Sequence, residues 1–391
     1  MRVLAFVGTR ADLFPLGPVL RKLGENAGVG LHVATAVGFQ EGAAAGQLLD
    51  AGLAGLAFEH HDLGLHLPEI TVAAQAAAGA ELSLRMSALL REVSPEALVV
   101  LGDRWELMYA VPPAVLSGTR VVHLHGGEVT EGALDERVRH AMTKLADQHC
   151  VSTAGAGRRV AQLGESADRI HVTGAPGLDR FAGVEPLSPQ EFEEALGVPL
   201  VRPAVLATYH PPTAGSGVDV RASAEGLFGE VVAQAGSAVM TYPGFDAGRD
   251  EIIGVLEGIA RSALPHVAVR ENLGSLYPRV LATVDAVVGN SSSGILEAAS
   301  FGLPVVNVGD RQKGRECGAN VLHCAEDRQA VADAMRQALS PGFRALSSQT
   351  ANPYGDSRAA GRIEGVIVNS GSTGLAKKFV DVEEGENSGD S

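Results

Sequence analysis

Aromatic residues and cysteines are scarce in this chain of 391 residues. Phe, Trp and Tyr make up 4% of it, whereas hydrophobic residues make up 46% and glycines number 48. This composition fits a globular α/β protein better than an all-β or a disordered one. The three cysteines are odd in number and lack the spacing of metal ligands: Cys150, Cys317 and Cys324. We therefore expect a reduced, cytoplasmic setting.

Positive charge and long apolar runs are also lacking. The 46 acidic residues outnumber the 31 lysines and arginines, which gives a formal net charge of −15. This balance argues against nucleic acid or an anionic membrane surface as the main partner, because both are negatively charged and bind positively charged protein surfaces. No stretch approaches the ~18 apolar residues of a membrane span. The N-terminus, MRVLAFVGTR, has neither the apolar segment nor the cleavage site of a secretion signal.

Short apolar runs alternate with helical patterns along the chain, which is typical of βαβ units and a parallel sheet. The predicted strands are 3–7, 31–35, 97–102, 120–124, 149–153 and 169–174, followed by 204–209, 237–242, 266–270, 285–289 and 304–308. A stretch rich in Gly and Pro, 174–190, separates the two series. We expect two Rossmann-like domains that face each other across a cleft, at 1–175 and 187–350. A C-terminal helix region (351–376) and a disordered acidic tail (377–391) are expected to follow.

Polar side chains follow the predicted strands, at the ends where ligands bind in doubly wound folds. The clearest signal is GNSSSGILE, in which Ser291–Gly294 form a polar turn before a helix. Backbone N–H groups there would face a phosphate, and an ordinary N-cap is the alternative. Glu297 follows about one turn later, where a carboxylate can accept both ribose hydroxyls. The stretch is neither a P-loop nor a dinucleotide motif, so we expect a uridine diphosphate sugar rather than ATP or NAD.

Three arginines follow predicted strands directly: Arg10, Arg104 and Arg311. An arginine in this place can pair with a diphosphate or a carboxylate, and an ion pair within the protein is the alternative. Since three of them stand at strand ends of an acidic chain, we favour the anion-binding interpretation.

Two carboxylates, Asp103 and Asp135, are candidates for an acid and a base, because crowding raises one pKa above the other. The alternative is structural: Asp135 starts a helix with Arg139 at i+4, and Asp103 is held by Arg104. His125 and His210 stand at strand ends and are candidates to bind phosphate or relay protons.

The remaining histidines give weaker signals. His123 is expected to pack within its strand. Five others are expected to be structural or solvent-facing: His32, His60, His61, His66 and His266. Neither an HExxH motif nor a Cys/His cluster indicates a metal.

Several stretches, in this order, resemble the hydrolysing UDP-N-acetylglucosamine 2-epimerase family of the sialic-acid and legionaminic-acid pathways. They are GTRADLFPLGPVL, VLGDRWE, HLHGGEVTEGALDERVRHAMTKL, VTGAPGLDRF, GNSSSGILEAASFGLPVVNVGDRQKGRECGANV and NPYGDSRAAGRI, within residues 3–368. The resemblance implies a glycosyltransferase-B-like fold and a homo-oligomer, either a dimer or a tetramer. It also implies a reaction without metal or NAD that turns a UDP-sugar into UDP and the free 2-epimer. The substrate would be UDP-GlcNAc or a UDP-2,4-diacetamido-2,4,6-trideoxy sugar.

The resemblance also implies residue roles. Asp103 and Asp135 correspond to catalytic carboxylates of the family, and Glu128 belongs to the same motif. Residues that hold the nucleotide sugar would be Arg10, Arg104, His210, Ser292, Ser293, Glu297 and Arg311. Many relatives have a catalytic Glu in place of His125, in an HxEGG motif. One expectation is that His125 or Glu128 takes over the acid/base role of that Glu. The alternative is that His125 recognises a differently substituted sugar. Phe14 and Gly244 stand where sialic-acid enzymes often have Ser and Asn that touch the substrate.

The reaction implied is elimination to a glycal followed by hydration. A non-hydrolysing epimerase, a glycosyltransferase of the same fold and a catalytically silent UDP-sugar sensor are the alternatives.

Overall fold

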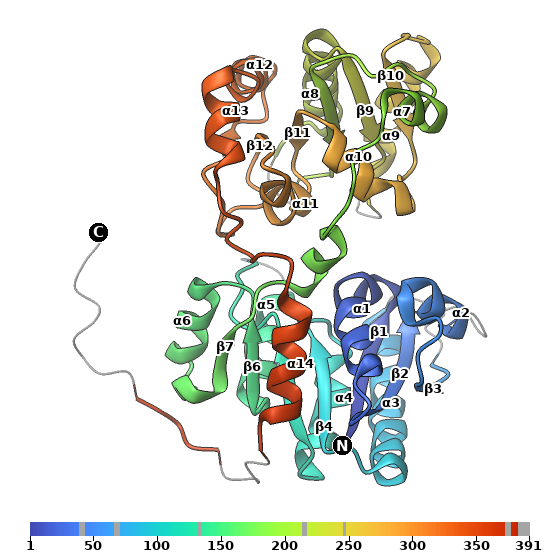
Figure 1. Cartoon of the computed structure of the whole chain (residues 1–391), viewed down its shortest axis with the longest axis vertical. Helices are drawn as coiled ribbons and strands as arrows, with labels where there is room; N and C mark the ends of the chain where they lie inside the picture. Colours follow the sequence, from blue (N-terminus) through green and yellow to red (C-terminus); the bar gives the residue numbers. More distant parts are fainter. Residues whose placement is uncertain are drawn as a thin grey trace. The chain divides into compact units, whose positions relative to one another are not determined.

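The computed structural model describes residues 1–38, 44–65, 71–130, 134–212, 217–244, 248–371 and 377–381. The chain divides into two compact units (Figure 1), one of Met1–Asp179 with the chain from Tyr354 onwards, and one of Arg180–Pro353. The division falls within the stretch rich in Gly and Pro at 174–190. Of the helix region expected at 351–376, the described residues from Tyr354 to 371 belong to the first unit. No helix of the described chain is long and apolar enough to cross a membrane.

The first unit contains a sheet of seven parallel strands in the order β3-β2-β1-β4-β5-β6-β7. These strands are β1 (Arg2–Thr9), β2 (Gly30–Gly38), β3 (Glu59–Asp62), β4 (Ala97–Leu101), β5 (Arg120–Leu124), β6 (Gln148–Val151) and β7 (Ile170–Val172). Their central members are apolar on both faces and fully buried, as a parallel sheet with helices on both sides requires. All six predicted strands of this half are confirmed, and β3 was not predicted.

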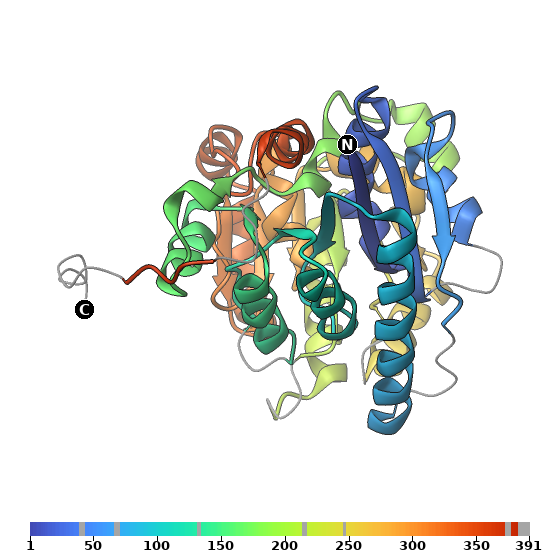
Figure 2. The same cartoon turned by 90° about the horizontal axis from the view of Figure 1, so that it is seen from below.

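Helices cover both faces of this sheet. One face packs against α1 (Arg10–Glu25) and α14 (Ala359–Asn369). The opposite face packs against α3 (Val72–Val93), α4 (Leu107–Leu116) and α5 (Leu134–Leu145), which lie side by side in Figure 2. The other helical segments are α2 (Ala44–Leu48), η1 (Leu49–Leu53), α6 (Ala154–Gln162), η2 (Ala167–Arg169) and η3 (Pro176–Phe181).

The second unit contains a sheet of six parallel strands in the order β10-β9-β8-β11-β12-β13. The strands are β8 (Ala204–Thr208), β9 (Ser237–Thr241), β10 (Val267–Arg270), β11 (Ala286–Gly289), β12 (Val305–Val308) and β13 (Val321–Cys324). The helical segments are α7 (Pro189–Leu196), α8 (Val220–Gln234), α9 (Arg249–Arg261), η4 (Gly274–Leu276), α10 (Tyr277–Thr283), α11 (Ser292–Leu296), η5 (Ala298–Phe301), α12 (Arg328–Ala338) and α13 (Pro341–Ser348). The predicted fold class of two Rossmann-like α/β domains is confirmed.

Residues 377–381 differ from the disordered tail expected at 377–391. The Lys377 ammonium donates to three backbone carbonyls at the C-terminal end of α5, at 2.6–3.2 Å. It also pairs with the buried Glu165 carboxylate at 2.7 Å. The Val380 N–H donates to the Gly164 carbonyl at 3.0 Å. These contacts fasten the segment to the first unit, and residues 382–391 lie outside the described part.

Candidate active site

Arg139 organises the polar residues at the carboxyl ends of β4 and β5. The helix α5 turns this side chain inward, where it is 2% exposed. Its guanidinium pairs with the Asp103 carboxylate and, at 2.7 Å, with Glu136 Oε2. It also donates to the Glu128 carbonyl at 2.7 Å and to Thr130 Oγ1 at 2.9 Å. One buried cation thus connects the loop after β4, the loop after β5 and the first turn of α5.

The ion pairs considered as structural alternatives for the two aspartates are not the ones formed. Arg139 pairs with Asp103 and Glu136 instead of Asp135. Arg104 pairs with Glu106 Oε1 at 3.0 Å instead of Asp103. Asp103 lies at a strand end within reach of the buried Arg139 guanidinium, whereas Asp135 lies in the first turn of α5, where part of its surface is open to solvent and its carboxyl is partly desolvated by its neighbours.

Asp103 and Asp135 lie close enough to influence each other. Burial raises the pKa of the Asp135 carboxyl, and the negative charge of Asp103 raises it further, against the charges of Arg139 and Arg104. Like charges that share a site favour the protonated form of one of them. The structure therefore brings together the two carboxylates that the sequence singled out, with a raised pKa for Asp135.

Arg104 belongs to the same electrostatic group. Burial opposes its charge, but the hydrogen bond that it donates to Glu106 and the charges of Glu106, Asp12 and Asp135 outweigh that effect and raise the pKa of Arg104. Arg10, by contrast, is exposed at the start of α1, and its side chain forms no hydrogen bond or ion pair with the described residues around it. Of these two predicted arginines, the structure places only Arg104 with the carboxylates.

His125 and Glu128 form a pair beside this network. His125 Nδ1 lies 2.6 Å from Glu128 Oε1, and the same oxygen accepts a hydrogen bond from Ser152 Oγ at 2.6 Å. His125 has φ 63°, a left-handed conformation that is rare for residues with a side chain and is often found at functional sites. The turn also needs Gly127, at φ 75°, since a Cβ there would collide with the Ala156 carbonyl. The local backbone thus holds an imidazole against a carboxylate.

His123 packs within β5, as predicted. Its Nε2 lies 2.7 Å from the Gly102 carbonyl oxygen, and complete burial lowers the pKa of this imidazole to about 3. A histidine that stays neutral in this way is unsuited to proton transfer near neutral pH.

In the second unit, Glu297 is the centre of the polar group after β11. Its carboxylate accepts hydrogen bonds from Ser293 Oγ at 2.8 Å and from Arg180 Nη2 at 3.0 Å. The Tyr277 hydroxyl contacts Ser293 Oγ. Burial and then the charge of Glu297 raise the pKa of Tyr277, so the phenol stays protonated. Ser292 begins α11 next to these groups.

His210, after the end of β8, is held by Asn290, the residue that follows β11. The Asn290 side chain accepts from the His210 N–H at 2.6 Å and donates to the His210 carbonyl at 2.8 Å. His210 Nδ1 accepts a hydrogen bond from the Gly244 N–H at 3.0 Å. Close approach of the two strands requires Gly289, because a Cβ there would collide with the Thr208 carbonyl. The imidazole is thereby fixed in orientation.

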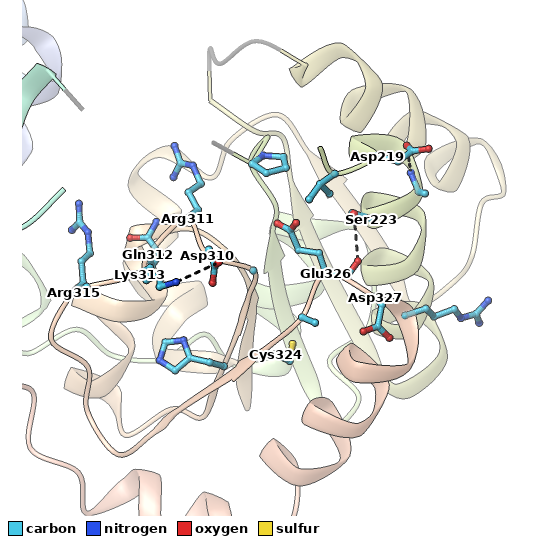
Figure 3. A pocket seen from close by; sticks show the side chains of 18 residues that line it. Asp219, Ser223, Asp310, Arg311, Gln312, Lys313, Arg315, Cys324, Glu326 and Asp327 are labelled. Carbon is cyan, nitrogen blue, oxygen red and sulfur yellow. Dashed lines mark hydrogen bonds and ion pairs between the residues drawn. The ribbon is translucent and has the colours of Figure 1, made fainter. Parts of the chain in front are cut away.

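Arg311 follows β12 and lines a cavity of about 1250 Å³ within the second unit (Figure 3). Lys313 and Arg315 lie on the same loop, and Lys313 pairs with Asp310 at 3.8 Å. Asp219 at the start of α8 lines another part of the cavity. The space is thus lined by basic side chains of the loop after β12 and by acidic side chains from other elements.

Several residues of these groups had no functional role predicted from the sequence: Glu136, Arg139, Ser152, Arg180 and Tyr277. Arg139 was considered only as an i+4 partner, although an arginine on the apolar face of an amphipathic helix is itself a signal of a buried ion pair. Arg180 stands in the quoted VTGAPGLDRF. Ser152 and Tyr277 carried no recognisable signal.

Potential metal ligands lie elsewhere. Within the described chain, the cluster of donor atoms close enough to hold one ion consists of His32, Glu59 and His61 at the edge of the first sheet. The residues around Asp103 and Glu297 are acids, arginines and hydroxyls, which suit proton transfer and the binding of a polar, anionic substrate.

Comparisons with known proteins agree on one kind of enzyme. A family model described as UDP-N-acetylglucosamine 2-epimerase matches residues 43–368. The UDP-N,N'-diacetylbacillosamine 2-epimerase (hydrolyzing) of Legionella pneumophila is 30% identical over 363 residues, which are 92% of this chain and 94% of that protein. The UDP-N-acetylglucosamine 2-epimerase of Neisseria meningitidis is 29% identical over 300 residues, 76% of this chain and 78% of that protein. A crystal structure of the Neisseria meningitidis UDP-GlcNAc 2-epimerase bound to UDP-GlcNAc shares the fold, with a TM-score of 0.75, 17% identity and coverage of 95% of this chain and 100% of that one.

Proposed function

Because this chain belongs to the UDP-N-acetylglucosamine 2-epimerase family, we propose that it is a hydrolysing UDP-sugar 2-epimerase. Its substrate is UDP-GlcNAc or a UDP-2,4-diacetamido-2,4,6-trideoxy sugar, and its products are UDP and the free 2-epimer. The hydrolysing type is supported by the relative from Legionella pneumophila, whose name includes that activity and which matches nearly the whole chain.

The observation that carries the proposal is the pair of carboxylates, Asp103 and Asp135. Asp103 is held by the buried Arg139, and its charge helps to raise the pKa of Asp135. Two carboxyl groups whose environments differ in this way suit one base and one acid. A glycosyltransferase needs an acceptor site instead and has no use for such a pair.

The first step is an elimination. A base takes the proton from C2 of the sugar, the C1–C2 double bond forms from the released electron pair, and the C1–O bond to UDP breaks. UDP leaves with the bonding electrons, and a glycal remains. We assign the proton transfers to Asp103 and Asp135, in the first unit.

The second step is a hydration. Water adds at C1 while an acid delivers a proton to C2 from the opposite face, so the released sugar is inverted at C2. We assign His125 to the acid or base position that relatives fill with Glu. The contact of 2.6 Å between His125 Nδ1 and Glu128 supports this role, because a carboxylate orients an imidazole and stabilises its protonated form.

The second unit is assigned to the nucleotide. Glu297 offers its carboxylate to the ribose, and Ser292, Ser293, His210 and Arg311 offer hydrogen bonds and charge to the diphosphate. Charge that develops on the departing diphosphate is stabilised by donors already in place. Arg10 and Arg104 are assigned to the sugar and diphosphate from the first unit.

The products decide between the alternatives. The purified chain is incubated with each of the two UDP-sugars in the presence of EDTA, and the products are followed by proton and phosphorus NMR. We expect UDP and a free sugar of manno configuration. A product that stays linked to UDP indicates a non-hydrolysing epimerase and contradicts the proposal. Turnover that needs an added acceptor indicates a glycosyltransferase.

A further inference from the structure

Two histidines and a glutamate meet at the edge of the first sheet. His32 Nδ1 lies 3.1 Å from His61 Nε2 and 3.4 Å from Glu59 Oε2. The three donor atoms all lie within 4.8 Å of one another. None of these residues takes part in the candidate active site or in the proposed reaction.

The strand pairing explains why they meet. In the register of β2 and β3, His32 stands opposite Glu59, and Ala34 stands opposite His61. Side chains alternate between the faces of a strand, so Glu59 and His61, two residues apart, share one face with His32. His60, between them, points to the other face, where its Nε2 lies 2.8 Å from Thr35 Oγ1. The cluster is thus built by a parallel pairing at the sheet edge, since β3 is the outermost strand.

We propose that His32, Glu59 and His61 form a binding site for a divalent transition metal such as Zn²⁺, which fastens the edge strand β3 to β2. Two imidazoles and a carboxylate are a ligand set that Zn²⁺ uses in proteins. Bonds of 2.0–2.1 Å in a tetrahedron place neighbouring ligand atoms about 3.3 Å apart. The distances of 3.1 Å and 3.4 Å are close to that separation.

The environment of the cluster suits a metal that enters from solvent. His32 is buried, whereas the Glu59 side chain is 73% exposed. His32 therefore offers its Nδ1 atom from the buried side of the cluster, and Glu59 offers its carboxylate from the side open to solvent. Water takes the fourth position of the tetrahedron. Without a metal, a single proton shared between the two imidazoles accounts for the distance of 3.1 Å, and the metal replaces that proton.

The test is a calorimetric titration of the chelator-treated full chain with ZnCl₂. The wild type is expected to bind one Zn²⁺ per chain and to melt at a higher temperature when Zn²⁺ is present. His61→Ala removes one ligand from the more exposed strand, so it is expected to abolish both effects, and Glu59→Gln is expected to weaken binding at least tenfold. His60→Ala is the matched control, because its side chain lies on the other face of β3, and it is expected to bind Zn²⁺ like the wild type.

Cysteines are the competing ligands, and Co²⁺ distinguishes them. Cobalt at the proposed site gives the visible spectrum of a tetrahedral ion with nitrogen and oxygen ligands, without a thiolate charge-transfer band. A thiolate band that disappears in a Cys317→Ser, Cys324→Ser variant would place the metal elsewhere and overturn the proposal. Equal Zn²⁺ binding by the wild type and His61→Ala, with circular dichroism showing both folded, would also overturn it, as would a wild type that binds no Zn²⁺.

Discussion

The buried guanidinium of Arg139, in α5, pairs with the carboxylate of Asp103, in the loop after β4. The same guanidinium holds Glu136 at 2.7 Å, while the Arg139 side chain is 2% exposed. Removing a buried cation from between two carboxylates strongly destabilises a protein, because the carboxylates left behind lose their partner. Arg139 is therefore a positioning residue for the acids that we assign to catalysis.

We expect Arg139→Lys to lower the free energy of unfolding by about 3 kcal/mol, because an ammonium cannot reproduce the planar, forked contacts of a guanidinium. Turnover at saturating substrate is expected to fall with the displaced Asp103. Urea denaturation and steady-state kinetics measure the two effects. Arg137→Lys is the control, since Arg137 is exposed on the same helix. Equal stability of both variants would show that the Arg139 network contributes nothing.

The coupling between the two aspartates predicts a pKa change. Asp103→Asn is expected to lower the pKa of Asp135, because it removes a negative charge that helps to raise that pKa. Burial remains, so only part of the shift is lost. The carbon-13 signal of the Asp135 carboxyl, followed by NMR against pH, measures the effect. The control is Glu92→Gln on the exposed face of α3, which should leave the titration unchanged. An unchanged or raised pKa in Asp103→Asn would mean that the two carboxyls do not interact.

The contacts of Glu297 lead us to expect weaker UDP binding when its carboxylate is replaced. Glu297→Gln weakens the pairing with Arg180 at 3.0 Å and removes the charge assigned to the ribose hydroxyls. Hydrogen bonds to a charged group contribute ~1.5–3 kcal/mol, so UDP affinity is expected to fall about 10–100-fold. Turnover at saturating substrate should change less, because this part of the substrate does not react. Glu271→Gln, exposed after β10, is the control, and calorimetry that finds equal UDP affinity in both variants would remove Glu297 from the site.

The ion pair of Lys377 with Glu165 is expected to stabilise the fold to an extent that depends on pH. Burial opposes the charge of Glu165, but hydrogen bonds from His149, Lys144 and Lys377 outweigh it and lower the pKa of Glu165 to about 2 from 4.5. Because the pKa of Glu165 is lower in the folded protein than in the unfolded chain, its ionised carboxylate stabilises the fold at pH values above the unfolded pKa. This contribution is lost as the pH falls towards 2 and the folded carboxylate becomes protonated.

Burial lowers the pKa of Lys377 and so opposes its charge, but its hydrogen bonds to Glu165 and to three carbonyls are lost on substitution. Lys377→Met is therefore expected to lower the free energy of unfolding by about 1–3 kcal/mol at neutral pH, with a smaller difference in acid. Urea denaturation at several pH values measures this. Lys378→Met changes an exposed neighbour and should have no effect. If the two variants are equally stable at neutral pH, the segment at 377–381 is not fastened through Lys377.

The sequence was sufficient for most of the fold, because the buried strands are continuous apolar runs that stand out between helical patterns. It failed at one edge of each sheet, at β3 and β13, whereas the edge strands β7 and β10 were predicted. β3, with the sequence EHHD, is polar and short, and β13 is only partly buried, so neither carries the apolar signal of a central strand. Edge strands are defined by pairing with a neighbour, which no local pattern reveals.

The sequence named candidate residues for the site but not the contacts between them. Helical spacing suggested that Asp135 pairs with Arg139, whereas Arg139 reaches Asp103 across two elements. The partner of Arg139 depends on which carboxylate the folded strand end brings near its guanidinium, and no periodic pattern in the sequence indicates this. Arg180 was missed as a partner of Glu297 for the same reason, since the two are far apart in sequence.

The most direct test of the proposed reaction is the isotope content of the product formed in deuterated water. The wild-type chain is incubated with its UDP-sugar in D₂O, and the released sugar is analysed by proton NMR and mass spectrometry. Elimination and hydration predict a free manno-configured sugar with deuterium at C2, because the proton removed there is replaced from an exchangeable group. A released sugar that retains the original hydrogen and configuration at C2 would contradict the account, as it would indicate simple hydrolysis of the bond to UDP.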